Sequence, residues 1–133
     1  MTEQTDMDLT QAEWAEVLRY SDVSRAGDLL FVSGQVGLDE NDQPQTDPAT
    51  QYRAAFESLR KALATVGARP EDVVDLMSYH TNYPDHVQEF IAAKNEFQGE
   101  GRPSWTAVGV ANLALPDTLV EIKAVAYQPA PRD

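Results

Sequence analysis

The order in which two hydrophobic periods alternate along the chain limits its possible folds more than any other feature. After Asp47-Pro48, and again after Pro84-Asp85, apolar residues recur every three or four positions, as in amphipathic helices. Elsewhere they recur every second position, as in strands. These strand-like segments span 20–25, 29–36, 72–82, 103–110 and 119–124, with a short further strand before Asp47. The predicted order is therefore β-β-(β)-α-β-α-β-β in one α+β domain.

The first helix is the clearest predicted element. Asp47 is a good N-cap and Pro48 suits the first helical turn, whereas Gly67 is the predicted C-cap. Its apolar face comprises Tyr52, Phe56, Leu59, Leu63 and Val66. The second helix has Val87, Phe90, Ile91 and Lys94 on one face and is followed by Gly99. Two helices cover only one face of a five- to six-stranded sheet, so Leu29 and Phe31 on the other face predict self-association.

The last two strands carry the clearest indication of a binding site. On the first, Trp105, Ala107 and Gly109 share a face; on the second, Glu121 and Lys123 share a face. If these two strands pair, an aromatic ring, small residues and a carboxylate line one concave surface. This arrangement is typical of a small-molecule site.

Composition restricts the classes of partner. The 133 residues carry a formal net charge of −12, from ten Lys and Arg against twenty-two Asp and Glu. Such a surface repels phosphate backbones, so nucleic-acid binding is not expected. The absence of cysteine excludes disulfides and thiolate chemistry. No apolar run is long enough to span a membrane and the N-terminus is acidic, which predicts a cytoplasmic protein without a signal peptide or membrane partner.

The predicted domain spans 19–128, between an N-terminal extension (1–18) and a tail (129–133). Residues up to about Thr10 are expected to be frayed, and Gln11–Leu18 is expected to form a short helical turn with Trp14 and Leu18 as its apolar contacts.

Several motifs in sequence make the chain resemble the RidA (YjgF) family from about Tyr20 to Tyr127. They are Tyr20-Ser21, the run Gly27–Gln35, Arg102-Pro103 and the run Val120–Ala126. The resemblance implies a chorismate-mutase-like fold and a homotrimer with a cleft at each subunit interface. It also implies hydrolysis of enamines and imines such as 2-aminoacrylate, and no cofactor or metal is expected.

The resemblance also implies site residues. Glu121 corresponds to the glutamate that positions water, Tyr20 to the tyrosine that closes the cleft, and backbone at Gly34 and Ala107 lines the pocket. Trp105 stands where the family has an arginine that binds the substrate carboxylate. An indole has one N–H donor and cannot replace a bidentate guanidinium. The chain therefore resembles a divergent, YjgH-like branch, and standard 2-imino-acid deamination is not expected.

Each of the other candidate residues has a purely structural interpretation as well as a functional one. Ser33 is interpreted as part of the pocket wall, because the motif around it is not that of a nucleophilic serine. Asn95 reaches the cleft rim or lies on a solvated helix face. His80 contacts the ligand or is structural, and its spacing to His86 is not that of a metal site. Trp105 contacts ligand or packs in a core or interface. Glu121 acts in the cleft, pairs with Lys123 or faces solvent.

Three functions follow. The leading one is a protein that binds a small metabolite and hydrolyses an enamine, an imine or a related compound through Glu121. The alternative is a non-enzymatic ligand-binding or chaperone-like protein. The third, an endoribonuclease, is disfavoured by the acidic charge.

Overall fold

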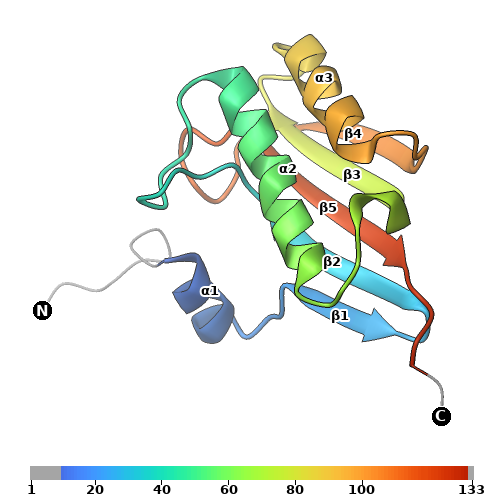
Figure 1. The fold of residues 1–133 in the computed structure, drawn as a ribbon. Coiled ribbons are helices and arrows are strands. Elements are labelled where there is room, and N and C mark those ends of the chain that lie inside the picture. Colours follow the sequence, from blue (N-terminus) through green and yellow to red (C-terminus); the bar gives the residue numbers. More distant parts are fainter. Residues whose placement is uncertain (1–9, 132–133) are drawn as a thin grey trace, which may run out of the picture.

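A computed structural model describes residues 10–131, which form a five-stranded sheet with two long helices on one face (Figure 1). The two long helices are α2 and α3, and a shorter helix, α1, precedes the first strand. In chain order the elements are α1 (Gln11–Leu18), β1 (Val23–Ala26), β2 (Leu29–Gln35), α2 (Pro48–Ala64), the 3-10 turn η2 (Pro70–Asp72), β3 (Val73–Thr81), α3 (Val87–Gln98), β4 (Ser104–Val110) and β5 (Val120–Tyr127). The predicted α+β class and element order are confirmed.

The strand order in the sheet is β1-β2-β5-β3-β4. All neighbours are antiparallel except β3 and β4, which are parallel and joined through α3. The expectation that the last two strands pair is wrong, because β3 lies between them. Parallel strands need a long crossover, and α3 provides one that returns the chain to the free edge of β3. The final strand then fills the gap between β2 and β3.

The core lies between the sheet and the two long helices. Leu59 and Leu63 of α2 and Phe90 of α3 are fully buried, against Leu76 of β3 and Ile122 of β5. Of the predicted α2 face, Tyr52, Phe56, Leu59 and Leu63 are buried. Val66 is 39% exposed, because the helix ends at Ala64 with Thr65 as its C-cap. Gly67, the predicted cap, lies two residues beyond, in a left-handed conformation (φ 74°).

Two other element boundaries differ from expectation. The short strand predicted before Asp47 is reduced to an isolated bridge between Leu38 and Pro44. The second helix begins at Val87 rather than at Pro84-Asp85. Asn82 and His86 both have positive φ, so the helical conformation cannot be continuous before Val87. The expectation of frayed residues 1–9 lies outside the described residues.

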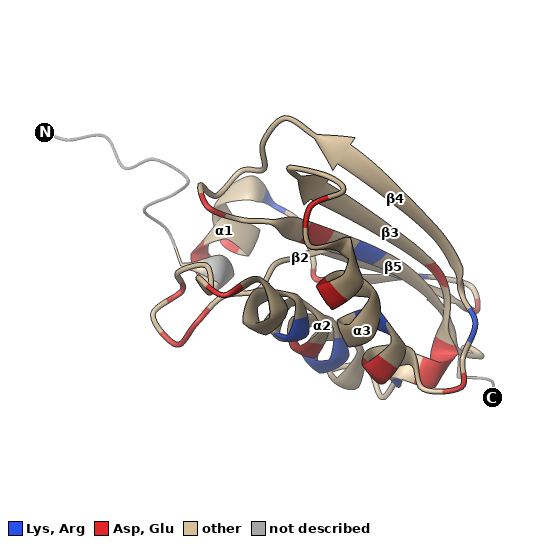
Figure 2. Cartoon of the chain, turned by 90° about the horizontal axis from the view of Figure 1, so that it is seen from above, with Lys and Arg blue, Asp and Glu red and all other residues tan. Residues whose placement is uncertain are grey.

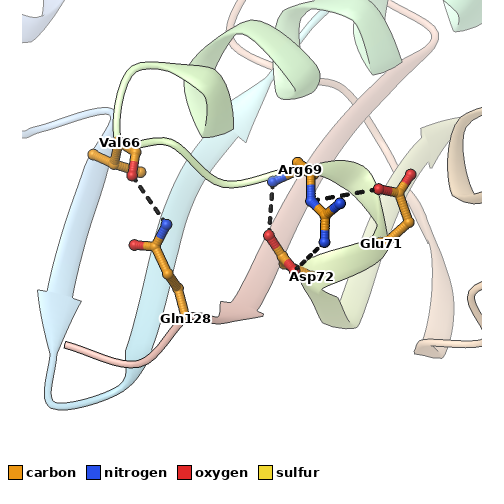
Figure 3. A network of polar contacts seen from close by, with 5 residues as sticks. All are labelled: Val66, Arg69, Glu71, Asp72 and Gln128. Carbon is orange, nitrogen blue, oxygen red and sulfur yellow. Dashed lines mark hydrogen bonds and ion pairs between the residues drawn. The ribbon is translucent and has the colours of Figure 1, made fainter. Parts of the chain in front are cut away.

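Polar contacts at the C-terminal end of β5 fasten the connection between α2 and β3 (Figure 3). Gln128 Nε2 donates to the carbonyl of Val66 at 3.1 Å. Arg69 donates its backbone N–H to Asp72 Oδ2 at 2.9 Å, and its guanidinium lies 3.7 Å from Glu71. The Gln128 bond holds the end of β5 against the segment that follows α2. The Arg69 contacts fix the turn η2, which leads into β3.

Neither α2 nor α3 covers the opposite face of the sheet (Figure 1), and the short helix α1 lies at one end of that side (Figure 2). Apolar side chains on this face are exposed: Leu29 by 37%, Phe31 by 38% and Tyr127 by 50%. Val125 of β5, which pairs with Phe31, lies on the same face. We call Leu29, Phe31, Val125 and Tyr127 the open-face patch. None of the helices in the described part of the chain is long and apolar enough to cross a membrane.

Candidate functional site

A pocket of about 320 Å³ on the open face brings together four of the predicted site residues: Tyr20, Ser33, Gly34 and Glu121. Trp14, Val36 and Lys123 complete its lining. We call it the Glu121 pocket. Residues that are a hundred positions apart in sequence meet there because β2 and β5 are neighbours in the sheet.

A β-bulge in β2 shapes this pocket. Val32 pairs with Ala124 and Gln35 with Ile122, so Ser33 and Gly34 together oppose Lys123. A bulge frees backbone groups from the ladder and re-aims the strand. Ser33 is fixed there, because its Oγ donates to the carbonyl of Ser21 at 2.6 Å. This bond ties the segment that follows Tyr20 to the bulge.

Gln35 and Gly34 support the bulge in different ways. Gln35 is buried, donates to the carbonyl of Ser33 at 3.1 Å and accepts from Ser58 of α2 at 2.6 Å. Gly34 lets the Glu121 side chain lie directly on the backbone, since a Cβ at position 34 would be 2.6 Å from Glu121 Cδ. The glycine therefore sets where the carboxylate can lie.

Glu121 has the electrostatics of a base that is available for chemistry. Within residues 10–131 no hydrogen bond or ion pair involves its carboxylate, so the alternative of a pair with Lys123 is not seen. Burial raises the pKa of Glu121. Burial also raises the pKa of Tyr20, to which the negative charges of Asp22 and Glu121 add.

Trp14 is a pocket residue that sequence reasoning assigned only to packing. It belongs to α1, whose N-terminus is fixed by a capping box between Thr10 and Glu13. Its Nε1 is buried and has no hydrogen-bond partner. An indole N–H that is buried without an acceptor costs free energy, so a ligand acceptor in the Glu121 pocket would satisfy it.

Trp105 and Ala107 do not share a surface with Glu121. Glu121 pairs with Tyr79, whereas Trp105 pairs with Leu76 and Ala107 with Ser78. Adjacent residues of β3 point to opposite faces, so Trp105 and Ala107 lie on the helix-covered side. The expected single concave surface is therefore wrong for one chain.

His80 forms part of the support beneath Trp105. Trp105 Nε1 donates to Ser78 Oγ at 2.9 Å, and Ser78 Oγ is 2.8 Å from His80 Nε2. The Ser78 hydroxyl can accept from the indole N–H and still either donate to or accept from His80 Nε2, so both neutral tautomers of His80 fit this contact. His80 is 2% exposed, and burial lowers its pKa to about 4. It lines neither the Glu121 pocket nor the pocket beside Trp105.

A second pocket, of about 670 Å³, lies beside Trp105 on the helix-covered side. We call it the Trp105 pocket. Asn95 lines it as predicted, together with Lys94, Gln98 and Arg102. Ala107 lines neither this pocket nor the Glu121 pocket. A further hollow of about 670 Å³, between the loops around Gln45 and Pro116, contains none of the predicted site residues.

The distribution of charged side chains bears on what the two pockets can bind. Acidic residues lie on the helices and on the loops, and the basic residues are scattered among them (Figure 2). No group of three or more His, Asp or Glu side chains among residues 10–131 is arranged to hold a metal ion. The two pockets offer the half-buried carboxylate of Glu121, the exposed carboxylate of Glu100, hydrogen-bond donors and aromatic side chains.

Relatives of known sequence were compared with the chain. A family model described as Endoribonuclease L-PSP matches residues 10–128. The RutC family protein YjgH of Escherichia coli is 45% identical over 112 residues, which cover 84% of each chain. The 3-aminoacrylate deaminase RutC of Acinetobacter baylyi is 30% identical over 112 residues, covering 81% of this chain and 86% of that protein.

Solved structures agree with the sequence matches. The structure of protein YjgH superposes with a TM-score of 0.79 at 42% identity, covering 88% of this chain and 89% of that one. Rv2704 of Mycobacterium tuberculosis, a member of the YjgF/YER057c/UK114 family, gives a TM-score of 0.78 at 32% identity, covering 90% and 96%. The sheet with its one-sided helices is the fold of these proteins. The chain therefore belongs to the Endoribonuclease L-PSP family, the group that includes the RidA, YjgF and RutC proteins.

Proposed function

We propose that the protein is a cytoplasmic homotrimer that binds a small metabolite in a cleft between subunits and hydrolyses an enamine or imine there. Glu121 is the proposed base. The observation that carries the proposal is the division of the predicted site residues between the two faces of one sheet. Tyr20, Ser33, Gly34 and Glu121 lie on one face, and Asn95 and Trp105 on the other.

A second copy of the chain is the natural way to join the two halves. The open-face patch exposes aromatic and aliphatic side chains beside the Glu121 pocket, and a chain of this size gains from burying them in an interface. β4 is an edge strand, so the Trp105 pocket lies where a neighbour can approach. In such an assembly the Trp105 pocket of one subunit faces the Glu121 pocket of the next.

The Glu121 carboxylate suits the hydrolytic step. In the proposed reaction it takes a proton from water as the water oxygen attacks the imine carbon. The carbon–nitrogen double bond becomes a single bond as the nitrogen takes up a proton. Collapse of the resulting carbinolamine releases ammonia and leaves a carbonyl compound. An enamine enters the same path after its carbon is protonated. A raised pKa makes Glu121 a stronger base than an exposed carboxylate.

Trp105 argues against the substrate preference of the arginine-containing members. Its single N–H already donates to Ser78 at 2.9 Å, so it offers a ligand no hydrogen bond. The 3-aminoacrylate deaminase among the relatives supports C–N hydrolysis within the family. The family description also names endoribonuclease activity, but a net charge of −12 opposes phosphate-backbone binding.

The test combines oligomeric state with ammonia release. Sedimentation should give the mass of three chains. Wild type should release ammonia from freshly generated 2-aminoacrylate, 2-iminopropionate or an uncharged imine, and Glu121→Ala should abolish release, whereas Glu40→Ala in an exposed loop should not.

Trp105→Arg should raise turnover of the two carboxylate-bearing substrates only. A stable monomer would overturn the proposal. A trimer whose turnover is the same with and without Glu121 would favour the non-enzymatic ligand-binding alternative.

A further inference from the structure

Lys94 is a buried cation without an acidic partner. It lies on α3, and only 8% of its surface is exposed. Its Nζ stands 4.7 Å from the centroid of the Trp105 ring. Among residues 10–131, no hydrogen bond or ion pair involves this ammonium group. The other two lysines, Lys61 and Lys123, are exposed to solvent.

Such a position is unfavourable in the empty protein. Removing an ammonium group from water costs several kcal/mol, and a cation–π contact returns about 0.5–2 kcal/mol. Burial accordingly lowers the pKa of Lys94. A negative charge placed beside Nζ would offset the remaining cost, so the site is complementary to an anion.

The surroundings of Lys94 are those of a binding site. Lys94 and Trp105 both line the Trp105 pocket, with Asn95 and Arg102. Gln98, one turn along α3, also lines it, and its Oε1 is buried with no hydrogen-bond partner. The residues of this pocket thus include a cation without a counter-ion and an acceptor without a donor, and its carboxylate, that of Glu100, is exposed and makes no ion pair with Lys94. Both groups are completed by a ligand that carries an anionic group and a donor.

We propose that Lys94 is the anion-binding residue of this protein, and that it holds the carboxylate, or another small anionic group, of the ligand beside Trp105. Helix α3 thereby provides a charge that strand β4 does not. The indole takes part as a support: its bond to Ser78 fixes the ring, and the ring fixes the ammonium group. The inference rests on the proposed function only in that the Trp105 pocket is one wall of the proposed cleft.

The experiment uses the full chain and a matched pair of probes, propionate and its neutral isostere propionamide. Binding is followed through the NMR signal of the Trp105 indole N–H, which a Trp14→Phe spectrum distinguishes from that of Trp14. Propionate should shift the Trp105 signal and propionamide should not. Lys94→Met should weaken propionate binding by at least about tenfold, the usual range for losing a charged hydrogen bond. Lys94→Arg should retain part of the affinity, and the exposed control Lys61→Met should retain all of it.

Lys94→Met is expected to fold, because it replaces an uncompensated charge by an apolar chain of similar length, and its Tm without ligand should rise. Three results would overturn the inference: equal binding of propionate and propionamide, unchanged propionate affinity in Lys94→Met, or loss of affinity in Arg102→Gln instead. A loss of trimer in Lys94→Met without any propionate binding by wild type would also overturn it, and would assign the counter-ion to a second copy.

The outcome is separable from that of the proposed function. Glu121→Ala should keep or raise the affinity for propionate, because Glu121 would bring only a negative charge, and no hydrogen-bond donor, to an anion in the proposed cleft. Ammonia release that fails while Lys94-dependent binding persists would remove the hydrolytic proposal and leave the anion site. Turnover of an uncharged imine that survives Lys94→Met, with no propionate binding in wild type, would do the reverse.

Discussion

The two faces of the sheet use alternate residues of the same strands, yet they differ sharply in burial. On β2, Leu30 and Val32 are 1% and 0% exposed under α2. Leu29 and Phe31, which alternate with them along the strand, are 37% and 38% exposed. The covered face is completed within one chain. The open face is apolar without a cover, so its stability depends on what packs against it.

The same contrast divides the functional residues. The covered side presents Trp105 on a fixed polar support and an ammonium group without a counter-ion. The open side presents a carboxylate on a strand bulge. Buried polar atoms without a partner occur on both sides, Gln98 Oε1 on the covered side and Trp14 Nε1 on the open side, and a third, Thr118 Oγ1, lies in the loop before β5. Neither half alone contains both Glu121 and Trp105, which the proposed cleft between subunits would bring together.

The strongest way to break the contrast is to empty the covered face. Leu59→Ala leaves a cavity at a fully buried position and should lower the free energy of unfolding by about 2–5 kcal/mol. Phe31→Glu, on the open face, should leave the far-UV circular dichroism spectrum intact and reduce the sedimenting mass to that of one chain. Urea denaturation and sedimentation measure the two effects. An unfolded Phe31→Glu chain would show that the open face belongs to the core.

The second prediction concerns pH and the covered face. The folded pKa of His80, about 4, is below its ordinary value of 6.5, so the unfolded chain binds more protons between these values. The contribution of neutral His80 is therefore present above pH 6.5 and lost as pH falls to 4. The loss amounts to roughly 3 kcal/mol at 1.4 kcal/mol per pH unit. Urea denaturation from pH 7 to pH 4 should show a shallower decline in His80→Gln. A His80 imidazole signal, identified by its loss in His80→Gln, that titrates near pH 6.5 would contradict this.

A smaller effect of opposite sign is expected on the open face. The folded pKa of Glu121 is raised, so its burial is least costly below pH 4.5 and costs stability as pH rises through the folded pKa. Glu121→Gln should therefore be more stable than wild type at pH 7, equal to it below pH 4.5, and inactive in ammonia release. Thermal unfolding at both pH values measures the difference. Lower stability at pH 7 would indicate a stabilising partner for this carboxylate.

The smallest expected change in stability is at Gly34. A Cβ there displaces the flexible Glu121 side chain rather than backbone, so Gly34→Ala should fold normally and lose activity. Because both changes act through the same carboxylate, Gly34→Ala combined with Glu121→Gln should be no less active than either alone. Ammonia-release assays of the three variants check this. Full activity in Gly34→Ala would mean that the carboxylate acts from another position.

Periodicity predicted the elements well because each period reflects burial on one side. The helix from Pro48 and the strand from Leu29 begin where expected, because their caps and apolar patterns are local. Alternation also assigned faces correctly in the last two strands: Glu121 is opposite Ile122, and Trp105 shares a face with Ala107. On β2 it placed Gln35 on the face of Leu29 and Phe31, which is wrong because the bulge turns Gln35 to the covered side. What alternation cannot provide is which strands are neighbours, and therefore which residues of different strands lie side by side. Strand order decides this, and α3 sets the order by returning the chain to the free edge of β3.

The site residues that were missed depend on packing rather than pattern. Lys94 was recognised as part of a helix face, but its lack of an acidic partner is a property of everything that surrounds it. Trp14 has no motif, and its place beside Glu121 follows from how α1 sits against β2. Tyr20, Ser33 and Gly34 were placed in the pocket with the help of the resemblance to a family. Members of a family share a fold, so matched residues are expected to share positions in space.

Helix α1 is the part of the Glu121 pocket that is least connected to the rest of the fold. It contributes Trp14 to a pocket whose other walls belong to the sheet, yet it joins the sheet only through the short segment from Arg19 to Asp22. No residue of α1 is part of the hydrophobic core. A substitution at Trp14 therefore reshapes this pocket without opening a cavity in the core, so α1 is the first place at which to redesign the pocket.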